Sequence, residues 1–303
     1  MSPPKVVLHP SHLRSVRDTF QQLEVELLLP DEDEVAAAIE ESGILVSFHW
    51  HDDYLPGLRW VQSISAGIDQ FPLEVFADRG IALTSASGVH GPQMAEHAFA
   101  LLLGLTRGIG VASRNATEAK WKRMVLHELS GLTVGILGLG AIGEEVARRA
   151  GAWDMRVIGT KRSVEGYRGH AEEVFPPSAT AEVFRRADVV ISVLPGGDET
   201  DGLVTREMLE SLGGWFVNLG RGNLVRESDI IAALESGGLL GAGLDVFEEE
   251  PLPPESPLWS HPRVIVTPHL GGLSPQYGAR LARIFADNLQ AFRGVGEWRN
   301  RVV

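Results

Sequence analysis

Three glycines in the segment GLGAIG have the spacing of a loop that binds the pyrophosphate of a dinucleotide. Gly138, Gly140 and Gly143 follow the apolar run LTVGIL, which predicts a β-strand, and precede EEVARRAG, which has the pattern of a helix. Glycines allow a tight turn and a close approach of the backbone to the phosphates, and the helix N-terminus offers N–H groups to them. The motif alone is weakly specific, and the related loop of a methyltransferase is the main alternative.

The segment VIGTKRS, residues 157–163, bears on which dinucleotide would bind. Sites that use NAD usually carry an Asp or Glu roughly twenty residues after the glycine loop, where it bonds the ribose hydroxyls. This chain has Lys161, Arg162 and Ser163 there. An arginine can hold a ribose 2′-phosphate through two parallel hydrogen bonds and a lysine adds positive charge, whereas a carboxylate would repel it. The segment predicts NADP(H) in preference to NAD(H), which could also bind; the alternative is a solvated charge pair after a strand.

The composition argues against several other classes of protein. The chain has 303 residues, of which 44% are hydrophobic and 22% charged, enough for two globular domains. A net charge of −13 with scattered basic residues argues against nucleic acid or a membrane as partner. Because the chain has no Cys, it has no disulfide, thiolate nucleophile or Cys-ligated metal, and we expect no metal site.

Two stretches bear on where the protein works. The N-terminal segment MSPPKVVLHP lacks the long apolar core of a signal peptide. The most apolar stretch, residues 98–105, is far shorter than the ~20 residues that span a bilayer. We therefore expect a cytoplasmic location.

Strand patterns alternate with helical patterns along the chain, which is typical of parallel β-α-β units. A first series of predicted strands covers residues 5–8, 44–48, 60–65 and 81–84. A second series covers the six strands expected of a Rossmann sheet, residues 132–138, 155–159, 188–194, 215–220, 242–246 and 263–269. Between the two series, residues 92–116 predict one long buried helix. Residues 277–293 predict a final helix that returns to the first domain.

Five ordered motifs carry a resemblance to a known family. They are GLGAIG, LPGGDETDGL (194–203), NLGRG (218–222), AGLDVFEEEPLPPESPLW (242–259) and VTPHLGG (266–272), and together they resemble the D-isomer-specific 2-hydroxyacid dehydrogenase family. The stretch EEEPLPPESPLW and the pair Trp50-His51 are most similar to its glyoxylate/hydroxypyruvate reductase branch.

The resemblance implies an α/β fold of two Rossmann-like domains with parallel sheets. A flavodoxin-like catalytic domain would be discontinuous, with residues 1–98 and 270–303, around an NAD(P)-binding domain of residues 99–269. Members of the family are usually dimers with the long linking helix at the interface, so we expect a homodimer.

The resemblance also implies a catalytic set for the reduction of a small 2-keto acid, with hydride from a nicotinamide ring. His269 would donate the proton to the carbonyl oxygen, because imidazole titrates near neutral pH. Glu250 would orient His269 and favour its protonated form, and Arg221 would bind the substrate carboxylate and polarise the keto oxygen.

Further positions match the family's binding residues. The backbone amides of Ala66 and Gly67 would receive the substrate carboxylate, and Trp50 would form a wall of the pocket. Asp245 would lie near the nicotinamide carboxamide. The remaining residues expected around the cofactor are Ala141, Ile142, Leu194, Pro195, Thr200, Leu219 and Gly271.

The sequence therefore predicts reduction of glyoxylate, hydroxypyruvate or a related small 2-keto acid to a D-2-hydroxy acid. One alternative is a dehydrogenase of the same fold that acts on longer 2-keto acids. Another, of a different class, is a dinucleotide-sensing scaffold like the corepressors that share this fold. The complete set of Arg221, Glu250 and His269 favours the enzyme.

Overall fold

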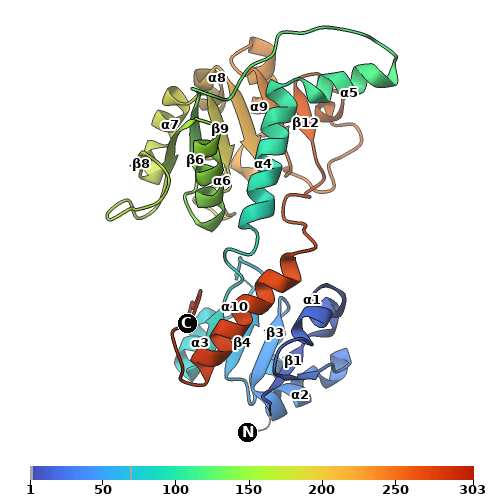
Figure 1. The fold of residues 1–303 in the computed structure, drawn as a ribbon, viewed down its shortest axis with the longest axis vertical. Coiled ribbons are helices and arrows are strands. Elements are labelled where there is room, and N and C mark those ends of the chain that lie inside the picture. The colour runs from blue at the N-terminus through green and yellow to red at the C-terminus, as the bar shows by residue number, and fades with distance from the viewer. Residues whose placement is uncertain (1–2, 69) are drawn as a thin grey trace. The chain divides into compact units, whose positions relative to one another are not determined.

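The chain divides into two compact units (Figure 1). The computed structural model describes residues 3–68 and 70–303, without the side chains of residues 12–15. Unit 1 comprises Met1–His90 and Ser274–Val303, and unit 2 comprises Gly91–Leu273.

These limits differ from the boundaries that the sequence placed after residues 98 and 269. The first of those falls inside helix α4 (Gly91–Thr106), whose first turns already pack in the core of unit 2 through Met94 and Ala95. The second differs because Leu270 and Gly271 donate backbone hydrogen bonds to Asp245 of unit 2.

Among the described residues of unit 1, the sheet has five parallel strands in the order β2-β1-β3-β4-β5, the flavodoxin-like order. The strands are β1 (Lys5–Leu8), β2 (Glu26–Leu28), β3 (Ile44–Ser47), β4 (Trp60–Ser63) and β5 (Ala82–Thr84). The sequence predicted four of them. It missed β2, a three-residue edge strand that is at most half-buried and so lacks the apolar run of its neighbours.

Alternation along the strands builds a core on each face of this sheet. Val6 and Leu8 point to one face, where they pack with helices α1 (Leu13–Phe20) and α10 (Tyr277–Phe292). Val7 points to the other face, which α2 (Val35–Ser42) and α3 (Leu73–Arg79) cover. The C-terminal helix α10 is thus part of unit 1.

Unit 2, every residue of which is described, contains a seven-stranded parallel sheet in the order β12-β11-β10-β9-β6-β7-β8. The strands are β6 (Thr133–Leu137), β7 (Arg156–Thr160), β8 (Glu173–Phe175), β9 (Val189–Ser192), β10 (Trp215–Asn218), β11 (Gly241–Leu244) and β12 (Val264–Val266). The prediction of six strands was wrong by one. Like β2, β8 is a half-buried three-residue edge strand, and it lies between acidic residues and prolines.

Helices cover both faces of the unit 2 sheet. Along β9, Val189 and Ile191 face the core beneath α4 and α6 (Ala141–Ala152), whereas Val190 faces the opposite core. That opposite face packs against α7 (Thr180–Arg186), α8 (Arg206–Leu212) and α9 (Glu227–Ser236). The order of the strands reverses between β6 and β9, so the carboxyl ends of these two strands form the switch point at which such sheets bind ligands.

The single helix predicted over 92–116 is two helices, α4 and α5 (Ile109–Thr117). They are separated at Gly108, whose φ of +66° ends the first helix because glycine alone adopts this conformation without a steric cost. The apolar stretch 98–105 packs in the core of unit 2. Helix α5, which the structure describes in full, has no buried residue; it contacts unit 2 through Arg114, which donates to the carbonyl of Pro262, and its C-terminal end projects outward (Figure 1).

Short 3-10 helices complete the list of elements, at Pro10–His12, Glu32–Glu34, Asp52–Tyr54, Pro177–Ala179, Gly222–Leu224 and Pro257–Trp259. Within residues 3–68 and 70–303, no helix has both the length and the apolar character needed to cross a membrane.

Candidate active site

Each glycine of the GLGAIG loop meets a different constraint. Gly138 ends β6 with φ of +98°, which permits the turn. At Gly143 a Cβ would lie 2.1 Å from the carbonyl oxygen of Gly138, so only glycine lets α6 begin this close to the strand. At Gly140 no heavy atom of the described residues lies within 4 Å of a Cβ, so the loop leaves open space there. This open space at a helix N-terminus is where a pyrophosphate would approach the backbone.

The loop is tied to the end of β7. Gly138 N–H donates to Thr160 Oγ1 (3.2 Å) and Leu139 N–H donates to the Thr160 carbonyl (2.8 Å). Lys161 Nζ donates to the carbonyl of Leu139 (2.5 Å). The Lys161 ammonium group, which the sequence predicted to bind a 2′-phosphate, is therefore already bonded to the loop. Two of its three N–H donors remain available for a phosphate.

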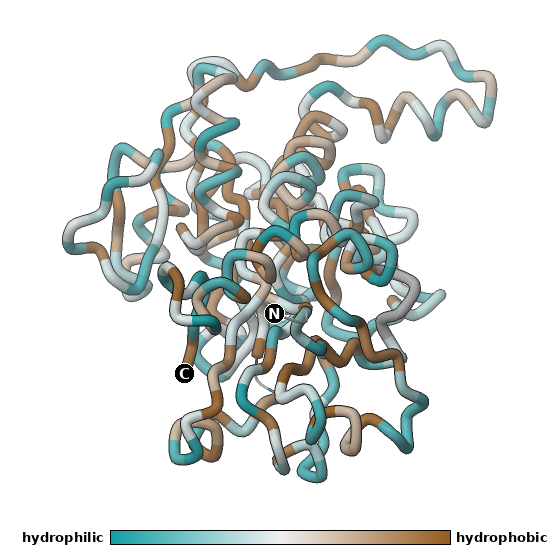
Figure 2. Tube along the Cα trace, turned by 60° about the horizontal axis from the view of Figure 1, so that its bottom comes forward, coloured by the Kyte–Doolittle hydropathy of each residue, from teal (hydrophilic) through white to brown (hydrophobic). Residues whose placement is uncertain are grey.

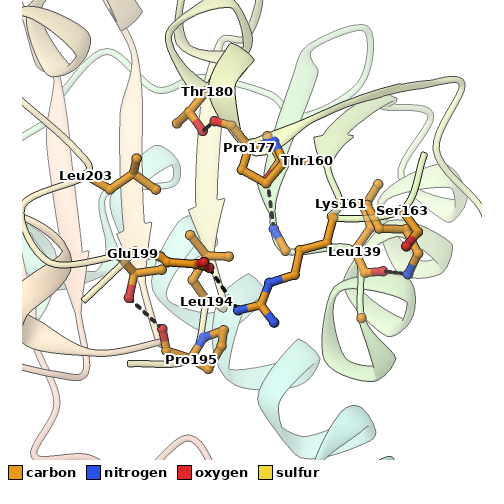
Figure 3. Close-up of a pocket in the computed structure, with 14 residues that line it drawn as sticks. Leu139, Thr160, Lys161, Ser163, Pro177, Thr180, Leu194, Pro195, Glu199 and Leu203 are labelled. Atoms are coloured by element: carbon orange, nitrogen blue, oxygen red, sulfur yellow. Dashed lines mark hydrogen bonds and ion pairs between the residues drawn. The ribbon is translucent and has the colours of Figure 1, made fainter. Parts of the chain in front are cut away.

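A cavity of about 300 Å³ lies at the carboxyl ends of β6, β7 and β9 (Figure 3). The structure brings eight predicted cofactor residues to its lining, namely Gly138, Gly140, Lys161, Arg162, Ser163, Leu194, Pro195 and Thr200. It also places six residues there that the sequence did not predict as cofactor residues, namely Leu139, Thr160, Pro177, Thr180, Glu199 and Leu203. Thr200 Oγ1 lies 3.0 Å from the carbonyl oxygens of both Pro195 and Gly197, which share its one proton, and this holds the turn.

Arg162 and Glu199 form an exposed ion pair in this lining. Arg162 Nη2 lies 3.3 Å from Glu199 Oε2, and the two side chains are 77% and 82% exposed. A pair this exposed is weak, so the guanidinium can exchange the carboxylate for another anion. Figure 3 shows Glu199 approaching the cavity from the side opposite Lys161 and Ser163.

Four other predicted cofactor residues have no side chain that is free to contact a cofactor. Ile142, in the first turn of α6, packs against the unit 2 core, and Leu219 is only 3% exposed within that core. Gly271 and Gly143 have no side chain, and the close packing around Gly143 leaves no room for one. Contacts from these positions to a cofactor would be made by the backbone. Ala141, by contrast, is exposed at the start of α6.

The structure brings His269 and Glu250 together. His269 Nδ1 lies 2.8 Å from Glu250 Oε2, and Glu250 Oε1 accepts a hydrogen bond from Phe247 N–H (3.0 Å). Because an ionised carboxylate only accepts, Nδ1 carries the proton of this bond, and the ring orientation is fixed with Nε2 as the second nitrogen. The imidazole is about half exposed, at 51%.

Arg221, Asp245 and His269 follow three adjacent strands at the same edge of the sheet. Asn218, Leu244 and Val266, at the ends of β10, β11 and β12, are register partners. Because neighbouring strands are about 4.8 Å apart, the residues that follow β10 and β12 lie roughly 10 Å from each other. A small substrate could therefore contact both the long Arg221 side chain and His269.

The loop that carries Arg221 is held by Asn218, a buried residue that the sequence did not single out. Asn218 Nδ2 donates to the Arg221 carbonyl (2.9 Å), and its Oδ1 accepts from Gly220 N–H (3.1 Å). Arg221 Nη1 donates to the Gly220 carbonyl (2.9 Å), and the Arg221 side chain stays exposed at the strand end.

Asp245 is 1% exposed and accepts hydrogen bonds from four groups: His97, Thr267 Oγ1, and the backbone N–H groups of Leu270 and Gly271. Burial by itself raises the pKa of the Asp245 carboxyl, but these hydrogen bonds together lower it below its usual value. The carboxylate is therefore ionised and enclosed by protein. His97 and Thr267 were not predicted, since a His on an apolar helix carries no motif of its own.

The substrate residues predicted in unit 1 also share one sheet edge. Trp50 follows β3, and Ala66 and Gly67 follow the neighbouring β4. The Trp50 ring packs edge-on against Phe76, with centroids 4.9 Å apart. Gly67 N–H donates to Ser65 Oγ (3.2 Å), and Ala66 and Gly67 are both exposed.

Clusters of potential metal ligands are absent from the part of the chain that the structure describes. No group of three or more His, Cys, Asp or Glu side chains there could hold a metal ion.

Known proteins resemble this chain in sequence over most of its length. Residues 99–271 match the NAD binding domain of the D-isomer specific 2-hydroxyacid dehydrogenases. Glyoxylate reductase of Korarchaeum cryptofilum (strain OPF8) is 34% identical over 248 residues, which cover 78% of this chain and 74% of that protein. Glyoxylate/hydroxypyruvate reductase B of Yersinia pestis bv. Antiqua (strain Nepal516) is 34% identical over 280 residues, or 86% of this chain and 84% of that protein.

Solved structures resemble it as well. A D-isomer specific 2-hydroxyacid dehydrogenase family protein from Aeromonas salmonicida subsp. salmonicida A449 has a TM-score of 0.78 and 30% identity, covering 100% of this chain and 99% of that chain. The NADPH-dependent glyoxylate/hydroxypyruvate reductase of Sinorhizobium meliloti, solved with citrate, has a TM-score of 0.78 and 28% identity, covering 99% and 97%. These similarities confirm the predicted α/β fold of two Rossmann-like units and the predicted resemblance to the reductase branch.

Proposed function

This chain belongs to the D-isomer specific 2-hydroxyacid dehydrogenase family, and we propose that it reduces glyoxylate, hydroxypyruvate or a related small 2-keto acid to the D-2-hydroxy acid. The observation that carries the proposal is the His269–Glu250 pair, held at 2.8 Å at the same sheet edge as Arg221. Relatives named for this reaction support the choice of substrate.

The residues of the GLGAIG loop fit a nicotinamide dinucleotide, because Gly140 leaves a cradle that a Cβ would fill. Bound there, the cofactor would supply hydride to the substrate carbonyl carbon. His269 would donate the proton on Nε2 to the carbonyl oxygen, while Glu250 stabilises the charge on the ring through Nδ1. Arg221 would bind the substrate carboxylate, a charge-assisted contact that also polarises the adjacent keto oxygen.

In unit 1, we assign the backbone amides of the exposed residues Ala66 and Gly67 to the substrate carboxylate, which would replace Ser65 Oγ as the acceptor for Gly67 N–H, and we assign Trp50 to the wall beside it. Backbone N–H groups suit this role because the fold fixes their positions. Asp245 is assigned to the nicotinamide end of the cofactor site.

We propose NADPH as the preferred cofactor. Arg162 lines the cavity and has only a weakly held carboxylate partner, so its guanidinium is available to a 2′-phosphate. The Sinorhizobium meliloti relative is described as NADPH-dependent, which agrees with this preference.

The deciding experiment is a matrix of initial rates with purified protein. NADPH and NADH are each combined with glyoxylate, hydroxypyruvate, pyruvate and longer 2-keto acids, and chiral analysis of the product gives its configuration. The proposal expects the highest kcat/KM for glyoxylate or hydroxypyruvate with NADPH. Higher values for the longer acids would favour a different substrate, and no turnover with any pair would end the enzyme assignment.

Substituting Gly140 with Ala is expected to weaken NADPH binding roughly tenfold without unfolding the protein, because the added methyl group enters the space reserved for the pyrophosphate. Gly140 has an extended backbone that alanine adopts readily. The measurement is the Kd for NADPH, together with the melting temperature.

Gly151→Ala is the matched control, since Gly151 lies at the other end of α6 and a Cβ there also meets open space. Unchanged NADPH affinity in Gly140→Ala would show that the cofactor does not approach the loop there.

We further propose a homodimer that forms through the arm, defined as residues 107–129. Two of its large apolar side chains lie in solvent: Trp121 is 95% exposed and Val125 88%. Figure 2 shows hydrophobic residues interspersed along this projecting segment. Exposed apolar side chains of this size mark interaction sites, and a self-complementary surface gives a two-fold dimer.

We also propose that the protein works in the cytoplasm. Fractionation of cells that express a tagged form of the protein tests this location.

Substituting Trp121 with Asp is expected to raise the dimer dissociation constant at least about tenfold, because a buried aromatic anchor would become a charge. Sedimentation over a range of concentrations measures it. Val295→Asp, at another exposed apolar position, in unit 1 (62%), should leave assembly unchanged. Equal assembly of both variants would place the interface elsewhere.

A further inference from the structure

The turn that carries His269 wraps around a single acidic residue. His269 N–H donates to the main-chain carbonyl of Asp245, Leu270 N–H to its Oδ1 and Gly271 N–H to its Oδ2, each at 2.9 Å. Three successive backbone N–H groups therefore converge on Asp245. His269 N–H also lies 3.0 Å from the carbonyl oxygen of Thr267, which belongs to the same turn.

The turn needs such an anchor because of its backbone conformation. His269 has φ of +52°, a left-handed value that non-glycine residues seldom adopt and that surrounding contacts must maintain. Space is also restricted: a Cβ at Gly271 would lie 2.9 Å from Asp245 Oδ2 and 3.0 Å from Met94 Sδ. The position of the His269 ring thus depends on where the Asp245 carboxylate is held.

The carboxylate is held in turn by His97 from helix α4. Thr267 Oγ1 donates its one proton to Asp245 Oδ1 (2.6 Å). His97 Nε2 lies 3.1 Å from that same Oδ1 and 2.9 Å from Thr267 Oγ1. Both atoms act as acceptors toward His97, so Nε2 must carry a proton and donate it.

With the bond from His97, Asp245 Oδ1 receives three donors, from His97, Thr267 and Leu270, whereas Oδ2 receives one, from Gly271. His97 is the one of these donors that comes from α4, 148 residues before Asp245. It therefore joins α4 to the ends of β11 and β12 at the catalytic edge of the sheet.

We propose that His97 is a positioning residue for the reaction: by donating to Asp245 and Thr267 it fixes the carboxylate around which the 269–271 turn forms, and so it sets where the His269 ring presents its proton. This rests on the proposed function, in which His269 is the proton donor. Asp245 then acts on catalysis through the turn as well as through its place near the cofactor.

The test compares His97→Leu, which removes the donor, with His97→Gln, whose side-chain amide restores one. Thr267→Val interrupts the same network with a side chain of similar shape. Glu96→Gln is the matched control, because Glu96 lies on the same helix and is 72% exposed. The measurements are kcat, KM, the Kd for NADPH, melting temperature and hydrogen exchange of the peptide that spans residues 267–273.

His97→Leu is expected to lower kcat about tenfold while the Kd for NADPH changes less than about twofold, as loss of one hydrogen bond to a charged group predicts. The amides of Leu270 and Gly271 should exchange faster. Thr267→Val should change kcat and exchange in the same direction, and His97→Gln should restore most of kcat.

Two results would overturn the proposal. Wild-type kcat and wild-type exchange in His97→Leu would show that the bond positions nothing. A lower melting temperature or weaker NADPH binding with unchanged kcat would assign His97 a structural role alone. If the wild type reduces no 2-keto acid, the proposed function fails by itself, and the exchange measurement still decides whether His97 anchors the turn.

Discussion

Replacement of His269 with Ala is expected to lower kcat about 10²- to 10⁴-fold, the range that general acid catalysis contributes. The substitution removes the imidazole bonded to Glu250, and the proposed proton donor to the carbonyl oxygen is lost with it. The Kd for NADPH should change little, because the cavity at β6, β7 and β9 does not include His269. Single-turnover rates and a fluorescence titration with NADPH measure the two quantities.

His261→Ala is a suitable control, because His261 is another histidine of unit 2. Among the side-chain contacts that the structure gives it, its Nδ1 accepts one hydrogen bond, from the nearby backbone N–H of Arg263. It should keep wild-type kcat. If His269→Ala instead lost cofactor affinity and kept its turnover, the assignment of His269 as the acid would be untenable.

Replacement of Arg162 with Ala is expected to lower kcat/KM for NADPH roughly 10- to 100-fold and that for NADH only slightly. Hydrogen bonds from a guanidinium to a phosphate are charge-assisted, and a loss of this size corresponds to one or two of them. NADH has no 2′-phosphate and so loses no such contact. The ratio of the two kcat/KM values is the quantity to measure.

Glu199→Gln provides the opposing test of the same contact. In the structure Glu199 pairs with Arg162 at 3.3 Å, so its carboxylate competes with a 2′-phosphate for the guanidinium. Its neutralisation should favour NADPH further. Equal losses with both cofactors in Arg162→Ala would mean that the arginine does not recognise the phosphate.

The sequence predicted the fold well wherever structure depends on local signals. The strands with long apolar runs and the GLGAIG turn were located because burial and glycine spacing are visible within a few residues. The two missed strands, β2 and β8, are three residues long, at most half-buried and formed only by pairing at a sheet edge. The break at Gly108 was not predicted, because only the positive φ of this residue in the structure reveals that the helix ends there.

For the candidate site, the family resemblance supplied the residues that carry a motif, and the structure pairs two of them, Glu250 and His269. The sequence did not single out Asn218, His97 or Glu199. Two of these act through contacts that depend on the folded chain: His97 meets Asp245 across 148 residues and Glu199 meets Arg162 across 37. Residue type alone gives no sign of such a partner.

The glycine loop has a consequence for how substitutions would be tolerated. Gly143 and Gly140 look equivalent in a motif, yet any Cβ at 143 collides with the Gly138 carbonyl, whereas one at 140 meets open space. A saturation library sorted only for folded, soluble expression should therefore reject nearly every residue at 143 and accept many at 140. The same library sorted for growth that depends on the enzyme should reject substitutions at both. Comparing the two selections would separate, at single positions, the demands of folding from those of cofactor binding.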